Sequence, residues 1–452
     1  RKNQIVNKLY KKKIQTRVIY PYPIHKMKAY KKLKFDRKKL LKSEIKSKGI
    51  FSLPLYPELK YDCCVIGIGR LGLCFALTLE RIGLRVCGVD VNPDYISKIN
   101  EKTLSSDEPG LEKSLQESIN FHATTCLNVG VQNSKVSFIL VPTPTDGGKY
   151  YYDHGILSNI LVRINNLEVS DKIIVVNSTL FPGYIRRIGR TLLRNCLRCS
   201  LNYNPAFVAQ GDVMTGYRTG GWFGMVLVGA EDEQAKDILC SIYRRIPRAQ
   251  NEGEVNICCM SPESAEICKL ASNCFRTTKI SFANMIGDIA DKSEGADKFD
   301  ICDALKCDKS IGHICMTPGY GYGGPCYPRD NKALALYARG VGVAPLIPVA
   351  TDEYNDIHHQ IMTTSCIESG NKIYEFFDVT YKPNCAVPMI DKSPKLEVAC
   401  SLARKGLKVK IIVYLNIFFV NIMSLNLLIF SNFHHKSFLK NIFISIRYSL
   451  TI

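Results

Sequence analysis

Residues 62–79 constrain the fold more than any other part of the chain. An apolar run stops at Gly67 and resumes, after Gly69 and Gly72, with helical spacing, which predicts a strand, a tight turn and a helix. Gly67 allows the turn, Gly69 lets a pyrophosphate approach the backbone, and Gly72 lets helix and strand pack closely. The next strand-like run ends at Asp90, eighteen residues after Gly72, where a carboxylate can bind a ribose 2′-hydroxyl and repel a 2′-phosphate. The pattern predicts an α/β fold with a Rossmann-like domain that binds NAD rather than NADP.

Two further strand-like runs, at 135–141 and 172–176, end in turns that contain threonine. Thr143 and Thr145 follow the first run and Thr179 follows the second. Ligands of open α/β sheets lie at the carboxyl ends of the strands, so these hydroxyls could contact cofactor or substrate. Turn formation and helix capping explain the same threonines equally well. The residues expected to bind NAD are Gly67, Ile68, Gly69, Leu71, Gly72, Asp90, Thr143 and Thr145.

The positive charge of the chain is concentrated in its first sixty residues. They hold nineteen Lys/Arg and three Asp/Glu, a balance of +16, which leaves +3 of the total +19 for the other 392 residues. Since the body is nearly neutral, we expect no nucleic acid bound to the core. At about 150 residues per domain, the length suggests two or three domains.

The Lys-rich segment 1–50 shows neither helical nor strand periodicity, and we interpret it as a disordered basic tail. The scarcity of acidic residues would also suit a transit peptide, although Lys predominates over Arg and Ser. A surface for anionic membranes or RNA is a further alternative.

Nineteen cysteines are spread singly and in adjacent pairs, with no clear secretory signal ahead of them. This usage fits small apolar core residues in a reducing compartment better than a disulfide framework, and we expect a cytoplasmic location. Cys196 and Cys199 have no second pair or histidine at zinc-site spacing, so we predict no metal site.

A long helix is expected over 265–290, where the sequence is mostly apolar. Residues 261–263, Ser-Pro-Glu, provide a cap, a first-turn proline and a favourable charge. Glu266, Lys269 and Asn273 fall on one face at i, i+3 and i+7. A solvated face would explain one such residue, but Lys269 and Asn273 among apolar neighbours are better explained as directed into a site.

The segment 319–330, Gly-Tyr-Gly-Tyr-Gly-Gly-Pro-Cys-Tyr-Pro-Arg-Asp, is suited to presenting Cys326. Its glycines permit positive φ and close approach, and its prolines stiffen the backbone beside the sulfur. A thiol is a strong nucleophile only as the thiolate, so a base or cation is needed nearby. Asp330 could turn back toward the thiol. An incidental cysteine in a glycine-rich loop is the alternative.

Five motifs, in this order and spacing, closely resemble those of the nucleotide-sugar dehydrogenase family. They are Gly67-x-Gly-x-x-Gly72, Val-Pro-Thr-Pro-Thr145, Ser-Thr179, Lys269-Leu-Ala-Ser-Asn273 and Gly323-Gly-Pro-Cys-Tyr-Pro-Arg-Asp330. The resemblance extends from about Tyr61 to about Val413. It implies an N-terminal Rossmann-like NAD-binding domain, a central long-helix dimerisation domain and a truncated C-terminal α/β nucleotide-sugar-binding domain. The expected segments are a basic tail at 1–58, the NAD-binding domain at 59–257, the central domain with the cysteine loop at 258–362, the partial C-terminal domain at 363–413 and an apolar tail at 414–452.

The resemblance also implies an activity, the oxidation of a sugar C6 alcohol to a carboxylate with two NAD in succession. The default substrate is UDP-glucose, and a homodimer or larger homo-oligomer is expected. Cys326 would form a thiohemiacetal and then a thioester, Lys269 and Asn273 would hold the C6 oxygen, and Asp330 and Thr179 would orient water. The implied catalytic residues are Cys326, Lys269, Asn273, Asp330 and Thr179. The implied substrate-binding residues are Phe207, Gln210, Lys269, Asn273, Tyr320 and Gly323.

Three positions depart from the family pattern. Ala206 stands where the family has a carboxylate thought to serve thioester hydrolysis, and Gln210 replaces a second glutamate. Ser310, sixteen residues before Cys326, stands where the family has an arginine that reaches the substrate of a neighbouring subunit. Impaired deacylation and weaker substrate binding are therefore expected.

The C-terminal end departs further. The uncharged apolar run 411–430 is long enough to span a bilayer as a helix. Its asparagines and biased Ile/Phe/Leu/Asn/Ser usage favour a replaced or truncated domain end instead, so membrane contact through this tail is the less favoured alternative.

Two further hypotheses compete with the dehydrogenase. A non-catalytic NAD or nucleotide-sugar binding relative would suit Ala206, Ser310 and the altered C-terminal end. An ordinary hydroxyacid dehydrogenase would suit the Rossmann-like domain, but a two-electron oxidation needs no thiol such as Cys326. Two, zero or one NADH per substrate molecule would distinguish the three.

Overall fold

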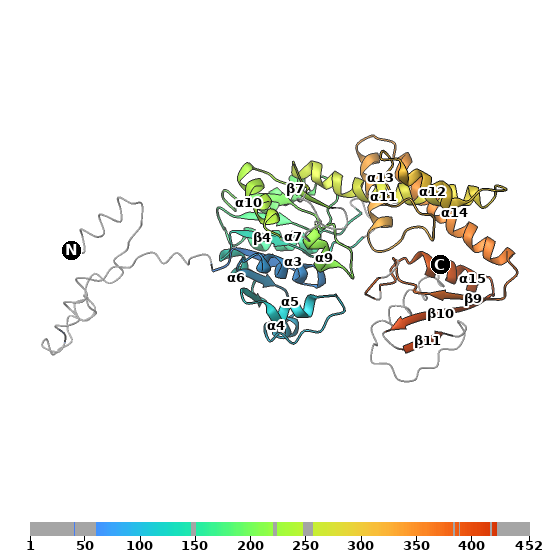
Figure 1. Ribbon diagram of the computed structural model, residues 1–452. Helices are drawn as coiled ribbons and strands as arrows, with labels where there is room; N and C mark the ends of the chain where they lie inside the picture. The colour runs from blue at the N-terminus through green and yellow to red at the C-terminus, as the bar shows by residue number, and fades with distance from the viewer. Residues whose placement is uncertain are drawn as a thin grey trace. The chain divides into compact units, whose positions relative to one another are not determined.

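A mostly parallel sheet of eight strands organises the first part of the chain in the computed structural model (Figure 1). The structure describes residues 40, 60–145, 151–219, 224–246, 256–382, 385–387, 389–415 and 418–422. The strand order is β3-β2-β1-β4-β5-β6-β7-β8, and only β6 and β7 pair in the antiparallel sense. The strands are β1 Cys63–Ile66, β2 Val86–Val89, β3 Phe121–Thr124, β4 Val136–Ile139, β5 Ile173–Val176, β6 Ser200–Tyr203, β7 Met225–Gly229 and β8 Asn256–Met260. The strand order reverses between β1 and β4, and ligands of such sheets bind beside this reversal.

The central strands β1, β4, β5 and β6 are buried at every position because both faces of the sheet are covered. In β1, Cys63 and Val65 join one buried cluster, and Cys64 and Ile66 join the cluster on the opposite face. Successive side chains of a strand point to opposite faces, so a strand with two covered faces is mostly apolar, and Ser137 of β4 and Asn202 of β6 are buried polar exceptions. The predicted α/β, Rossmann-like fold is confirmed.

Helices connect these strands and cover the sheet. Those of the first part are α3 Arg70–Arg81, α4 Pro93–Asn100, α5 Leu111–Glu117, α6 Leu127–Gln132, α7 Gly155–Asn165, the π-helix η3 Ile185–Gly189, α8 Arg190–Leu192, α9 Val213–Thr219 and α10 Glu233–Arg244. Those that follow are α11 Pro262–Ala290, α12 Lys298–Cys307, α13 Tyr327–Gly340 and α14 Leu346–Glu368.

Helix α11 is the long helix expected from the sequence, and its 29 residues confirm that prediction. Ser261 caps it by accepting a hydrogen bond from the backbone N–H of Ser264 at 3.2 Å, and Pro262 occupies the first turn. The helix contacts β7 and β6 of the sheet and also packs against α12, α13 and α14. Side chains of α11 can therefore contact both the eight-stranded sheet and the helices that follow it.

A second, smaller sheet follows α14, with strand order β11-β10-β9. Its elements are β9 Ile373–Phe377, α15 Pro394–Arg404, β10 Lys408–Leu415 and β11 Phe418–Ile422. The first half of the apolar run at 411–430 thus forms paired strands rather than the membrane-spanning helix considered as an alternative. No helix among the described residues is long and apolar enough to cross a membrane.

The basic tail predicted for residues 1–58, apart from Leu40, and residues 423–452 of the apolar tail lie outside the described residues. All nineteen cysteines lie among the described residues, and each is a free thiol. Across the described ranges, no group of three or more His, Cys, Asp or Glu side chains could hold a metal ion.

Candidate active site

The glycine turn after β1 combines tight packing with open backbone. Gly67 has φ +87°, and its N–H donates to the carbonyl oxygen of Val89 at 2.8 Å. A Cβ on Gly72 would lie 2.0 Å from the carbonyl oxygen of Gly67, so only glycine lets α3 begin so close to the turn. A Cβ on Gly69 would meet nothing within 4 Å, which fits a backbone that a pyrophosphate can approach. Ile68 is fully buried in the core beside the turn.

Asp90 directly follows β2, the neighbour of β1, and it is half-buried. One of its carboxylate oxygens accepts the backbone N–H of Asn92 at 3.3 Å. Leu71 is half-buried and packs against the core beneath α3. A carboxylate at this strand end, beside the glycine turn, is suited to a ribose 2′-hydroxyl.

The threonine turns lie at the ends of β4 and β5, which are neighbouring strands. Thr143 is buried, and its hydroxyl donates to the carbonyl oxygen of Thr179 at 2.9 Å, so the two turns are tied together. Thr179 is half-buried and Thr145 is exposed. The hydroxyl hydrogen of Thr143 is therefore used within the protein, and its oxygen retains only an accepting capacity.

Cys326 lies at the N-terminus of α13, where helix dipoles favour a negative charge. It is exposed, although the protein atoms around the sulfur desolvate it enough to raise the pKa of the thiol. The charge of Asp330 acts in the same direction, whereas Arg329 and Lys269 lower that pKa. The thiolate thus depends on two cations that lie within electrostatic reach.

Asp330 is fully buried, and both of its carboxylate oxygens are engaged. Oδ1 accepts the hydroxyl of Tyr152 at 2.8 Å, and Oδ2 accepts the side-chain amide of Asn273 at 2.7 Å. The Nε atom of Arg329 lies 3.5 Å from Oδ1. The carboxylate therefore orients Asn273, and these bonds connect α11, α13 and the segment before α7.

Lys269 is almost completely buried, and desolvation lowers the pKa of its ammonium group. The charges of Asp330 and Cys326 oppose that shift. Its Nζ atom donates to the carbonyl oxygen of Ala206 at 3.0 Å and lies 4.3 Å from the ring centre of Phe207. A lysine ammonium has three N–H groups, so others remain for a ligand oxygen.

Two family models match most of the described chain. The UDP-glucose/GDP-mannose dehydrogenase family, NAD binding domain, matches residues 61–247, and the central domain of the same family matches residues 263–357. The chain belongs to the UDP-glucose/GDP-mannose dehydrogenase family. Its first part is that family's NAD-binding domain, which the glycine turn and Asp90 fit.

Relatives of this dehydrogenase family differ in the substrate that they are named for. The chain is 28% identical to GDP-mannose 6-dehydrogenase of Pseudomonas aeruginosa over 77% of this chain and 80% of the relative. It is also 28% identical to UDP-glucose 6-dehydrogenase of the same organism, over 77% of each chain. The structure of a UDP-glucose dehydrogenase from Pyrobaculum islandicum matches with a TM-score of 0.70 at 24% identity, covering 80% of this chain and 84% of that one. Separately, residues 1–65 match the DegT/DnrJ/EryC1/StrS aminotransferase family.

Each of the three positions that depart from the family pattern makes a hydrogen bond within the protein. Ala206 is half-buried, and its carbonyl oxygen holds Lys269. The side-chain oxygen of Gln210 accepts from Arg70 at 3.4 Å, next to the glycine turn. Ser310 is exposed and donates through its hydroxyl to Asp308 at 2.7 Å.

The remaining expected substrate residues are less closely grouped. Tyr320 is 37% exposed, and Lys395 lies 5.6 Å from its ring centre. A Cβ on Gly323 would lie 1.8 Å from the carbonyl oxygen of Lys392, which gives this glycine a packing role against the backbone. Glu266 shares a buried face of α11 with Lys269, and its carboxylate accepts the backbone N–H groups of Gly183 and Ile185, just before and at the start of η3.

Sequence reasoning missed Tyr152 and the contacts of Arg329. Arg329 lies within the cysteine motif, donates to the carbonyl oxygen of Thr143 at 3.2 Å and stacks 4.9 Å from the ring centre of Tyr152. Its position in the motif, three residues after Cys326, was a usable signal. Tyr152 belongs to no motif, so nothing in the sequence distinguished it.

Proposed function

We propose that this family member oxidises the C6 alcohol of a nucleotide sugar to the carboxylate, with Cys326 as the covalent nucleophile. The arrangement that supports this most is the thiol at the N-terminus of α13, with Lys269 and Arg329 in electrostatic contact and Asn273 fixed by Asp330. NAD would accept one hydride from C6 in each of two oxidations, held by the glycine turn and Asp90. Overall, one alcohol, two NAD⁺ and one water give one carboxylate, two NADH and three protons.

The residues have distinct parts in this sequence. Lys269 and Asn273 stabilise negative charge on the C6 oxygen, because a desolvated cation and an oriented amide interact strongly in a low-dielectric site. The Cys326 thiolate adds to the C6 aldehyde, forming a C–S bond, and the former carbonyl oxygen takes a proton. Loss of the second hydride from C6 to NAD⁺, together with the hydroxyl proton, leaves a thioester on Cys326. Water then cleaves the C–S bond, giving the carboxylate and regenerating the thiol.

Deacylation is the step that this chain is least equipped to assist. The methyl group of Ala206 cannot accept a proton from water, and its backbone carbonyl is already bonded to Lys269. Both oxygens of Asp330 accept hydrogen bonds from protein groups. Loss of a general base costs about 10²–10⁴ in rate. We therefore propose slow hydrolysis of the thioester.

UDP-glucose is the proposed substrate and GDP-mannose the principal competitor. The chain is 28% identical both to a relative named for GDP-mannose and to one named for UDP-glucose, so both nucleotide sugars are tested. NADH release would be followed with each nucleotide sugar for the parent, Cys326→Ser and the neighbouring-thiol control Cys315→Ser. We expect Cys315→Ser to match the parent and Cys326→Ser to lose the second oxidation. Equal NADH yield per sugar from Cys326→Ser would contradict the covalent mechanism.

A non-catalytic binding function is the second candidate. Ala206 supplies no base, and Ser310 is bonded to Asp308 on the surface rather than presenting a cation. Calorimetric titration with NAD and each nucleotide sugar would show binding without turnover in that case. NADH formation by the parent, with the second NADH per sugar lost in Cys326→Ser, would exclude it.

We also propose that the chain forms a homodimer through α11, in the cytoplasm. Phe275, Phe282 and Ile289 are 68%, 45% and 53% exposed on α11, and their spacing of seven places them on one face. Light scattering should give a dimer mass for the parent and a monomer mass for Phe282→Glu. A monomeric parent would contradict the proposal.

A further inference from the structure

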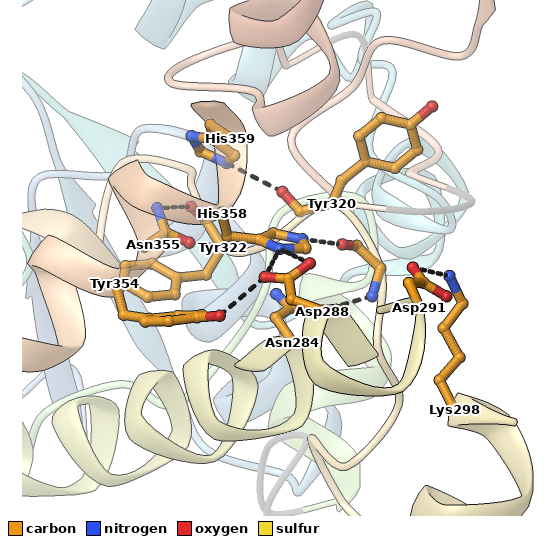
Figure 2. Close-up of polar contacts among 11 residues, drawn as sticks. Asn284, Asp288, Asp291, Lys298, Tyr320, Tyr322, Tyr354, Asn355, His358 and His359 are labelled. Carbon is orange, nitrogen blue, oxygen red and sulfur yellow. Dashed lines mark hydrogen bonds and ion pairs between the residues drawn. The ribbon is translucent and has the colours of Figure 1, made fainter. Parts of the chain in front are cut away.

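The segment 319–322, which leads into Cys326, has its backbone held by side chains from two helices. Figure 2 shows these side chains converging from α11 and α14. They make five bonds: Asn284 Oδ1 accepts Gly319 N–H at 2.8 Å, His358 Nε2 lies 2.6 Å from Gly319 O, His359 Nε2 lies 3.0 Å from Tyr320 O, Asn355 Oδ1 accepts Tyr322 N–H at 2.9 Å and Asn355 Nδ2 donates to Tyr322 O at 3.2 Å. These bonds satisfy backbone groups on both sides of Gly321 and so fix the segment to the two helices.

His358 is the central member of this set, because both of its ring nitrogens face acceptors. Its Nε2 faces the carbonyl oxygen of Gly319, and its Nδ1 lies 2.8 Å and 3.1 Å from the two carboxylate oxygens of Asp288. A carbonyl oxygen can only accept, so Nε2 donates to Gly319, while Nδ1 shares a hydrogen with the carboxyl group of Asp288. The ring is thereby held at both nitrogens.

The pair formed by His358 and Asp288 is buried, at 5% and 8% exposure. The hydroxyl of Tyr354 donates to the same carboxylate at 2.8 Å, so Asp288 has two partners on α14 (Figure 2). His359 is the other titratable group beside His358, with an electrostatic effect between them. Removal of one partner of such a pair leaves a buried charge uncompensated, so the geometry is costly to disturb.

Gly321 lets the loop approach α14 closely. It has φ +84°, and a Cβ there would lie 2.6 Å from Asn355 Oδ1 and 3.0 Å from His359 Nε2. A side chain at this position would push the loop away from both residues. The loop and the helix surface are therefore matched along the segment.

The bonds continue from this segment to the first turn of α13. The hydroxyl of Tyr322 donates to Asp352 at 2.5 Å and accepts from the amide of Asn331 at 3.1 Å. Asn331 directly follows Asp330, whose N–H donates to the carbonyl oxygen of Cys326 at 2.8 Å. A displacement of the segment would thus be transmitted to the residues that carry the chemistry.

We propose that His358, paired with Asp288, is a positioning residue that holds the Cys326 loop against α14 through the carbonyl oxygen of Gly319. This inference rests on the proposed function, since it assigns His358 an indirect effect on the Cys326 reaction. His358 touches neither the thiol nor the bonds of Asp330. It acts by fixing the backbone from which Tyr320 and Cys326 extend.

The test compares His358→Ala and the conservative His358→Gln, which retains one amide donor, with the control His313→Ala at an exposed histidine of the preceding segment. Hydrogen exchange would be read on peptides covering 317–331 and on peptides from β1 and β5. We expect His358→Ala to speed exchange of the 319–322 amides about tenfold or more, with the sheet peptides unchanged. His358→Gln should restore part of the protection.

In the same variants, kcat with the preferred nucleotide sugar should fall about 10- to 100-fold in His358→Ala while the Kd for NAD is unchanged, because a displacement near 1 Å can cost that much. His358→Gln should recover part of kcat. A double variant with Asp288→Asn should lose less than the product of the two single losses.

The outcomes separate this inference from the proposed function. Unchanged exchange at 319–322 in His358→Ala would overturn it, as would a uniform rise in exchange over the whole chain, which indicates general stability. Local exchange that rises without any change in kcat would also overturn it. If the parent shows no turnover at all, the proposed function fails, while the exchange experiment still decides whether His358 holds the loop.

Discussion

Tyr152→Phe tests the buried network around Asp330 by removing one oxygen. The hydroxyl of Tyr152 donates to Oδ1 of Asp330 at 2.8 Å, and both side chains are at most 1% exposed. A hydrogen bond to a charged group contributes about 1.5–3 kcal/mol. The phenyl ring stays among Phe181, Leu270 and Ala333, so the packing contribution is retained. We therefore expect the free energy of unfolding to fall by about 1.5–3 kcal/mol.

The assay is urea unfolding at pH 7.5, followed by circular dichroism, with the adjacent and half-buried Tyr151→Phe as matched control. In an Asp330→Asn background, Tyr152→Phe should cost clearly less, because the charged acceptor is gone. Asn273 would also lose part of its orientation, and a kcat lower by about tenfold corresponds to about 1.4 kcal/mol of transition-state stabilisation. Equal stability of Tyr152→Phe and Tyr151→Phe, within about 0.5 kcal/mol, would refute this reasoning.

Three further predictions address other parts of the site. Burial raises the pKa of Glu266 from 4.5 to about 7, so the folded chain binds this proton more tightly than the unfolded chain. The buried charge therefore lowers the free energy of unfolding by its full amount above pH 7, and this loss disappears as the pH falls toward 4.5. The urea midpoint of the parent should thus rise from pH 7 to pH 4.5, and that of Glu266→Gln should change less over the same range. Parallel plots of urea midpoint against pH for the two proteins would contradict this. Gly72→Ala should lose about 3 kcal/mol or more because its Cβ would meet the Gly67 carbonyl, whereas Gly69→Ala should stay folded and bind NAD more weakly by calorimetry; equal stability losses would count against the packing argument. Ala206→Glu should raise steady-state NADH production and Ala206→Gln should not, since an amide cannot take a proton from water; no difference between them would place the slow step elsewhere.

The parts of the fold that follow from local patterns could be predicted from the sequence. The glycine turn, Asp90 at the end of β2 and the cap of α11 each depend on residues close together in the chain. The apolar run at 411–430 was ambiguous, because a strand buried in a sheet and a helical span both need continuous apolar residues. Pairing of β10 with β9 and β11 decided its described half.

The contacts that complete the site could not be predicted. Tyr152 and Asp330 are 178 residues apart, and Asp288 and His358 are 70 residues apart. Only tertiary packing brings these pairs together: the segment before α7 meets α13 in the first pair, and α11 meets α14 in the second. Glu266 shares a helical face with Lys269, but the two side chains meet different parts of the chain. Lys269 donates to the carbonyl oxygen of Ala206, whereas the carboxylate of Glu266, three residues earlier, accepts a backbone N–H of η3. Helical periodicity identifies a face but not what covers it.

The most direct test of the central claim is the mass of the peptide containing Cys326 in samples quenched during the first turnover with NAD and UDP-glucose or GDP-mannose. NADH would be counted per active site in the same samples. The account predicts a burst of NADH, a covalent acyl adduct of the sugar nucleotide on Cys326, and slow decay of that adduct to the carboxylate. NADH formation with no adduct on Cys326, at a rate unchanged in Cys326→Ser, would contradict it.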